Sequence, residues 1–108
     1  MTEDKLEPAA EAEAANRIDA LRASSYDEAA NMPTAAAEDI VVAGKEVQLT
    51  VFRQNGIPEH PDAVLITVQI SRAGLGGIVN FFLEKGLVFL PGGETRDATE
   101  DELAATRS

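Results

Sequence analysis

Apolar and polar residues alternate through the middle of the chain in a pattern that predicts β-strands. In residues 46–54, Val47, Leu49 and Val51 alternate with polar neighbours, as expected for a strand with one buried and one solvated face. Residues 63–72 show the strongest alternation, with an aliphatic side chain at every second position. The polar loop between them has eight residues. A parallel crossover needs about a dozen or more residues, so we expect these two strands to be antiparallel.

Shorter apolar runs lie on either side of these two strands. Residues 40–43 come before them, and Gly44-Lys45 between the runs predicts a tight hairpin. Residues 87–90 have the composition of a buried strand, and Pro91-Gly92-Gly93 turns the chain toward a short edge strand at 94–97. The sequence therefore predicts a small antiparallel sheet of three main strands plus a short hairpin.

The segment between these strands and the hairpin fits two different secondary structures. Its apolar residues follow the spacing of a helical face, and Gly86 stands where a left-handed C-terminal cap would lie. The alternative is a strand over residues 78–83 followed by a turn at 84–86, because short apolar runs are ambiguous. We favour the helix, and the strand stays open. The residues in helical spacing are Leu75, Ile78, Val79, Phe82 and Leu83.

The two ends of the chain carry helical signals. Residues 8–23 are rich in Ala, Glu and Arg, and Pro8 suits a first helical turn. The low hydrophobicity and high charge of residues 1–35 also fit a partly disordered segment. Capping-box spacings at Ser25/Glu28 and Thr99/Glu102 predict a short second helix and a final helix to about residue 106.

Together these elements define an α+β fold, in which an N-terminal, a central and a C-terminal helix accompany the antiparallel sheet. Residues 33–38 have the composition of a linker. We therefore expect an acidic, Ala/Glu-rich segment at 1–35 and a compact α+β domain at 36–108. The element order α-β-β-β-α-β-β-α, together with small size and acidity, resembles that of secretion-effector chaperones. The resemblance implies a chaperone-like interaction protein.

Composition and charge narrow the function. The chain carries 19 acidic and 9 basic residues, a net charge of −10. Residues 1–40 hold 10 acidic against 3 basic side chains and residues 94–108 hold 5 against 2, so both ends are acidic while 41–93 is neutral. This balance argues against direct binding to nucleic acid or to anionic lipid.

Several classes of site and location are also disfavoured. The chain has no cysteine, which excludes disulfides and cysteine-ligated metals. It has no apolar run long enough to span a membrane and no secretory-signal pattern at its start, so a cytoplasmic location is expected. No cofactor motif is present.

Two weak chemical sites can be named. Arg72 precedes Gly74-Leu75-Gly76-Gly77, and backbone N–H groups at a glycine turn that opens a helix can bind an anion, with Gly76 and Gly77 as the contacts. His60 lies between Glu59 and Asp62 in a polar loop, but one imidazole with two nearby carboxylates is more typical of a solvated loop than of a metal or acid–base site.

The apolar segment around residues 78–90 is the stronger candidate. Leu75, Phe81, Phe82 and Phe89 could form a surface for a protein partner or a second copy of the chain. We therefore expect a non-enzymatic, acidic interaction module such as an adaptor, inhibitor or chaperone, dimeric and binding a basic or extended partner. The alternatives are a small anion-binding domain that uses Arg72, and an inhibitor whose acidic ends mimic nucleic acid. Removing residues 1–35 is then expected to leave the sheet folded.

Overall fold

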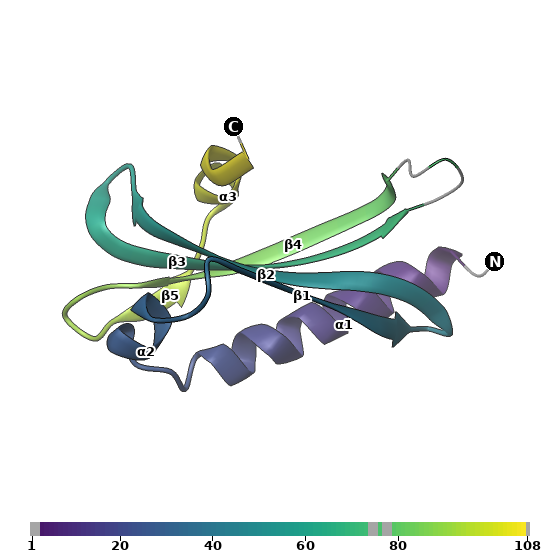
Figure 1. Cartoon of the computed structure of the whole chain (residues 1–108), viewed down its shortest axis with the longest axis horizontal. Helices are drawn as coiled ribbons and strands as arrows, with labels where there is room; N and C mark the ends of the chain where they lie inside the picture. Colours follow the sequence, from purple (N-terminus) through teal and green to yellow (C-terminus); the bar gives the residue numbers. More distant parts are fainter. Residues whose placement is uncertain (1–2, 74–75, 77–78, 108) are drawn as a thin grey trace.

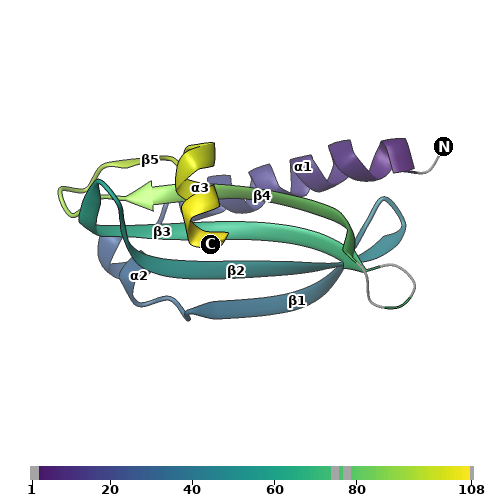
Figure 2. The ribbon, with the colours of Figure 1, turned by 90° about the horizontal axis from the view of Figure 1, so that it is seen from above.

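Successive strands of the chain lie side by side in one antiparallel sheet, in the order β1-β2-β3-β4-β5 (Figures 1 and 2). The structure is a computed structural model that describes residues 3–73, 76 and 79–107. Within these residues it has five strands and three helices, so the α+β class and the antiparallel sheet are confirmed. The elements are α1 (Glu3–Leu21), α2 (Tyr26–Ala30), β1 (Ala35–Val42), β2 (Lys45–Ile57), β3 (His60–Ala73), β4 (Val79–Phe89), β5 (Thr95–Asp97) and α3 (Glu100–Arg107).

The expected central helix is wrong, and the alternative strand is found in its place. Strand β4 pairs with β3 along most of its length, from Phe89 opposite Val64 to Phe81 opposite Arg72. This pairing satisfies backbone groups along β3 that a helix would have left without a neighbour. The arrangement is therefore four long strands and one short strand, not three strands with a hairpin. The element order that carried the chaperone resemblance is not the observed one.

Gly86 is part of β4 and does not cap a helix. Its missing side chain makes room for the start of α3, because a Cβ atom built there would lie 2.9 Å from Leu103 Cδ2 and 3.1 Å from Ala98 Cβ. The backbone contact is also close, at 3.2 Å from the carbonyl oxygen of Ile66. A glycine within a strand often marks such a close approach.

The strands are longer than the sequence predicted. The predicted linker contributes to β1, which starts at Ala35 opposite Phe52. The predicted eight-residue loop is mostly strand, because β2 runs to Ile57 and β3 begins at His60, with a register shift beside Gly56. A tight hairpin is present as predicted, but its two turn residues are Ala43 and Gly44 rather than Gly44 and Lys45, because Lys45 begins β2 opposite Val42. Both turn residues have positive φ, as a two-residue type I′ turn requires.

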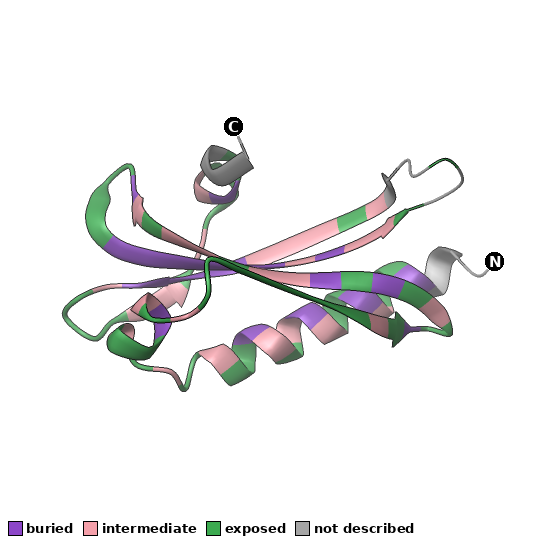
Figure 3. Cartoon of the chain, in the orientation of Figure 1, coloured by how far each residue is buried: buried purple, intermediate pink, exposed green. Residues whose placement is uncertain are grey.

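Helices α1 and α2 cover one face of the sheet and form the main core with it (Figures 1 and 3). Helix α1 begins at Glu3, five residues before Pro8, and buries four side chains at intervals of four: Leu6, Ala10, Ala14 and Ile18. Because two of these are alanine, the helix can lie close to the sheet. The strands supply larger apolar side chains, among them Leu49, Ile66, Val68, Ile70, Leu87 and Phe89.

Helix α3 lies on the opposite face and covers only one part of it (Figure 2). Leu103 is buried there beside Gly86, and Ala98 packs on a second, smaller cluster of Ile57, Ala63, Leu65 and Val88. Both predicted capping boxes are present at the starts of α2 and α3. None of the described helices is long and apolar enough to cross a membrane.

Candidate functional site

The sheet face that points away from α1 is left largely uncovered, and we call its β1–β4 side chains the open face. Val41, Phe52 and Phe82, the large apolar side chains exposed in the described part of the chain, all belong to it. They are 67%, 37% and 44% exposed. Their chain neighbours Val42, Val51 and Leu83 pack in the core on the helix side of the sheet. Because successive side chains of a strand point to opposite faces, the three exposed residues point away from that core.

Polar and acidic side chains surround these three. Four polar side chains of β2 and β3 point to the same side and occupy the middle of the open face: Gln48, Thr50, Gln69 and Ser71. Gln69 Nε2 donates a hydrogen bond to Glu84 Oε2 at 3.3 Å. The carboxylates of the open face are Asp39, Glu46 and Glu84.

Basic side chains are nearly absent from the open face. The strand alternation directs Lys45, Arg53, Arg72 and Lys85 to the other face of the sheet. Arg96 is opposite Val88 on the open-face side, but it is paired with Glu102. Among the described residues, the side chains of the open face on β1–β4 are therefore apolar, neutral polar or acidic.

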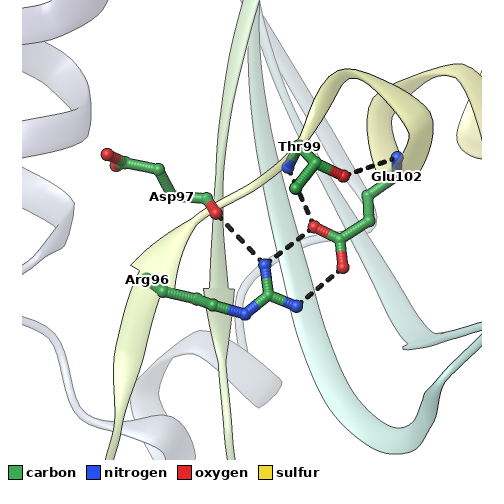
Figure 4. A network of polar contacts seen from close by, with 4 residues as sticks. All are labelled: Arg96, Asp97, Thr99 and Glu102. Atoms are coloured by element: carbon green, nitrogen blue, oxygen red, sulfur yellow. Dashed lines mark hydrogen bonds and ion pairs between the residues drawn. The ribbon is translucent and has the colours of Figure 1, made fainter.

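Arg96, Thr99 and Glu102 form a polar network that anchors α3 beside this face (Figure 4). The Arg96 guanidinium donates two hydrogen bonds to Glu102, from Nη2 to Oε2 at 2.7 Å and from Nη1 to Oε1 at 2.8 Å. Nη1 also donates to the carbonyl oxygen of Asp97 at 3.2 Å. Thr99 N–H donates to Glu102 Oε1, and Glu102 N–H donates to Thr99 Oγ1, closing the capping box. Above all the Arg96 hydrogen bonds, and then the Thr99 backbone, hold the pKa of the Glu102 carboxyl at about 2.

This network predicts a pH dependence of stability. The pKa of Glu102 is about 2 in the folded chain and about 4.5 in the unfolded one. The stabilisation is therefore complete above pH 4.5 and is lost as the pH falls toward 2. Glu102→Gln should remove this contribution, so the stability difference between wild type and variant should shrink across that window. Urea unfolding at a series of pH values measures it, and a pH-independent difference would contradict the role of the ion pair.

Further ion pairs connect the acidic helix α1 to the sheet. Arg17 Nη1 lies 2.7 Å from Glu38 Oε1, and Lys85 Nζ lies 3.0 Å from Glu11 Oε1. Arg22 pairs with Asp97 across the end of β5, and this hydrogen bond raises the pKa of Arg22. Part of the acidity of the chain ends is therefore used to hold elements of this molecule together.

The residues predicted to bind a partner separate into different environments. Phe82 is exposed on the open face, Phe81 is half-buried against the helix-side core, and Phe89 is fully buried at 1% exposure. Leu75 lies outside the described residues. Of the three that the structure describes, Phe82 is the one in an exposed position, at 44% exposure, where a partner could contact it.

Val41 and Phe52 were not singled out from the sequence, although a signal for Phe52 was present. In the alternation of residues 46–54, Phe52 stands at one of the positions that otherwise hold polar residues. A large apolar residue at a position in register with Gln48 and Thr50 indicates an apolar side chain on the solvated face.

The predicted anion site lacks the helix on which it depended. Gly76 is exposed with positive φ, while Gly77 lies outside the described residues. Along the described part of the chain the next strand or α-helix is strand β4, so none of the described α-helices begins beside Arg72. Arg72 lines a shallow hollow together with Asp39 and Glu46, which is a poor setting for an anion. Anion binding stays a prediction.

The His60 loop is an exposed hairpin tip. His60 is the first residue of β3 and pairs with Ile57. Tyr26 Oη donates to the carbonyl oxygen of Asp62 at 2.6 Å, which ties this tip to α2. Within the described ranges, no group of three or more His, Cys, Asp or Glu side chains is placed to hold a metal ion.

Comparison with known protein families, curated proteins and solved structures finds no match for this chain.

Proposed function

We propose that this chain is a non-enzymatic interaction module that binds a basic protein partner on its open face. The observation that carries the proposal is the placement of Val41, Phe52 and Phe82 on the sheet face that also bears the carboxylates of Asp39, Glu46 and Glu84. The strand register places polar side chains such as Gln48 and Ser71 between the three apolar ones, so a partner would bury the apolar side chains by covering the face as a whole. Such a mixture of apolar and polar contacts is typical of protein–protein interfaces.

Charge selects the kind of partner. Asp39, Glu46 and Glu84 give the open face a negative potential, and the whole molecule carries −10. A partner with Lys or Arg around an apolar patch would be steered toward this face and held there. Two open faces packed on each other would oppose six carboxylates, so a second copy is disfavoured on this surface. The predicted homodimer stays a prediction.

Affinity capture from cell extract tests the proposal. The bait is compared with a Val41→Thr/Phe52→Thr double variant, which keeps strand-forming residues but removes two of the three large apolar side chains exposed on the open face. Captured proteins identified by mass spectrometry should be basic, be released by high salt and be lost with the double variant.

A matched control carries two substitutions on the outer surface of α1, Ala12→Gln and Ala20→Gln, both at exposed positions. It should capture the same proteins as wild type. The proposal is contradicted if the double variant captures the wild-type set, or if the captured proteins are acidic and insensitive to salt.

A further inference from the structure

Strand β4 has an outer edge that its neighbour covers only at one end. Strand β5 pairs with Leu87–Phe89, whereas β4 starts eight residues earlier, at Val79 (Figure 2). In the part of the chain that the structure describes, no strand lies against β4 on this side before Leu87. A sheet edge of this kind is a template for an added strand.

Two hydrogen bonds, one just before β5 and one just after it, show which backbone groups of β4 point toward this edge. The N–H of Ala98 donates to the carbonyl oxygen of Gly86 at 2.9 Å, and the N–H of Leu90 donates to Glu94 at 2.8 Å. Outward and inward residues alternate along an antiparallel strand, so the N–H and C=O of Phe82 point outward as well.

A hollow of about 340 Å³ lies along the same edge, just past the end of β5. Its floor is Glu84–Gly86 of β4. Helix α1 contributes one wall with Asp19 and Arg22, and α3 contributes the other with Glu100 and Leu103. An extended segment that continued the line of β5 along β4 would therefore lie between two helices.

The charge of this hollow favours a basic occupant. Its carboxylates are Asp19, Glu84, Asp97 and Glu100, and its cations are Arg22 and Lys85. Both cations are engaged in ion pairs, Arg22 with Asp19 and Asp97, and Lys85 with Glu11. The net charge of the lining is −2, from four carboxylates and two cations.

A second copy of the chain would fit this edge poorly. Antiparallel self-pairing of β4 would bring two hollows of the same negative sign together, along with the exposed Glu7 and Glu11 of the two α1 helices. Like charges brought together across an interface are destabilising.

We propose that the outer edge of β4 binds an extended, Lys- or Arg-bearing segment of another protein by antiparallel strand addition between α1 and α3. Backbone hydrogen bonds to β4 would supply affinity, and the carboxylates of the hollow would select basic side chains. The inference shares the basic partner with the proposed function but uses the backbone edge of β4 rather than the sheet face, with Glu84 common to both, so either can fail alone.

Three labelled peptides of equal length test the mode of binding on the wild-type chain by fluorescence anisotropy. The first alternates Lys and Val, the second alternates Glu and Val, and the third is the Lys/Val peptide with every backbone nitrogen methylated. The Lys/Val peptide should bind and the Glu/Val peptide should not. The methylated peptide keeps the charge but has no backbone N–H to donate in either register, so it should bind about tenfold more weakly or worse. Equal binding of the Lys/Val peptide and its methylated form would show attraction by charge alone and overturn strand addition.

Two proline variants then locate the edge. Phe82→Pro removes an outward N–H that β4 does not donate to β3, and proline is tolerated at such edge positions. The matched control is Ala37→Pro on β1. The N–H of Arg53 donates to Thr34 O, so even-numbered residues of β1 face β2 and Ala37 faces outward. Phe82→Pro should weaken the Lys/Val peptide about tenfold, and Ala37→Pro should leave it unchanged within about twofold.

Phe82→Ala separates the backbone from the side chain, because it keeps the N–H and should retain more binding than Phe82→Pro. Circular dichroism confirms that each variant is folded. No binding of the Lys/Val peptide, or equal losses in both proline variants, would overturn the inference while leaving the open-face experiment unaffected. Sedimentation equilibrium adds one outcome: a wild-type dimer that Phe82→Pro converts to a monomer would place a second copy on this edge and overturn the inference as well.

Discussion

Ala14→Glu is expected to unfold most of the protein, while Ala12→Glu on the same helix leaves it folded. Ala14 has no exposed surface and packs among the sheet residues of the main core, whereas Ala12 faces solvent. A glutamate at position 14 must either bury an unpaired carboxylate or push α1 away from the sheet. We expect a loss of at least about 3 kcal/mol, a large share of the stability of a domain this small.

The control makes the result specific. Both variants add one negative charge to the same acidic helix, so a general charge effect would appear equally in both. For Ala12→Glu we expect a change within about 0.5 kcal/mol. Urea unfolding followed by circular dichroism gives both values, and similar stabilities of the two variants would show that α1 does not form part of the core.

This packing reverses the expectation for the N-terminal segment. Leu6, Ala10, Ala14 and Ile18 of α1, and Ala29 of α2, belong to the same buried cluster as the sheet. Removal of residues 1–35 would expose that cluster to water, so loss of folding is now the expected result.

Phe89→Ala is expected to cost about 3–5 kcal/mol of unfolding free energy, and Phe82→Ala less than about 1 kcal/mol. The two phenylalanines lie on the same strand, but Phe89 is 1% exposed and Phe82 is 44% exposed. Truncating Phe89 leaves a cavity between the sheet and the helices, whereas truncating Phe82 removes surface already in contact with water.

Denaturant unfolding of both variants measures this difference. It also separates two roles that the sequence could not distinguish, since both residues were candidates for partner contact. Comparable losses would show that Phe82 is buried in solution, for example in a homodimer. In that case the midpoint of unfolding would also depend on protein concentration.

Local patterns predicted much of the fold. Ser25/Glu28 and Thr99/Glu102 form their capping boxes within four residues, so no tertiary information was needed. The alternation in 46–54 and 63–72 is long enough to identify β2 and β3, and the short connection implied their antiparallel pairing.

The structure of residues 79–86 could not be decided locally. The spacing of Val79, Phe82 and Leu83 suits a helix, and the same residues also fit a strand. The pairing partner settled the choice, because β3 is buried on both faces and has a second edge that β4 fills. The role of Gly86 could not be decided locally either. A glycine is needed there because α3, from residues 100–107, packs against it, and no pattern near residue 86 indicates that contact.

The sequence by itself therefore determined the acidity, the class of fold, the two central strands and the caps of α2 and α3, because each depends on composition or on neighbours within a few residues. Only the tertiary structure decided which side chains meet solvent. It placed Val41, Phe52 and Phe82 on one uncovered face, buried Phe89, and left the outer edge of β4 open between α1 and α3. The physical reason is that exposure and edge pairing depend on elements distant along the chain, and short-range periodicity carries no information about what will cover a strand.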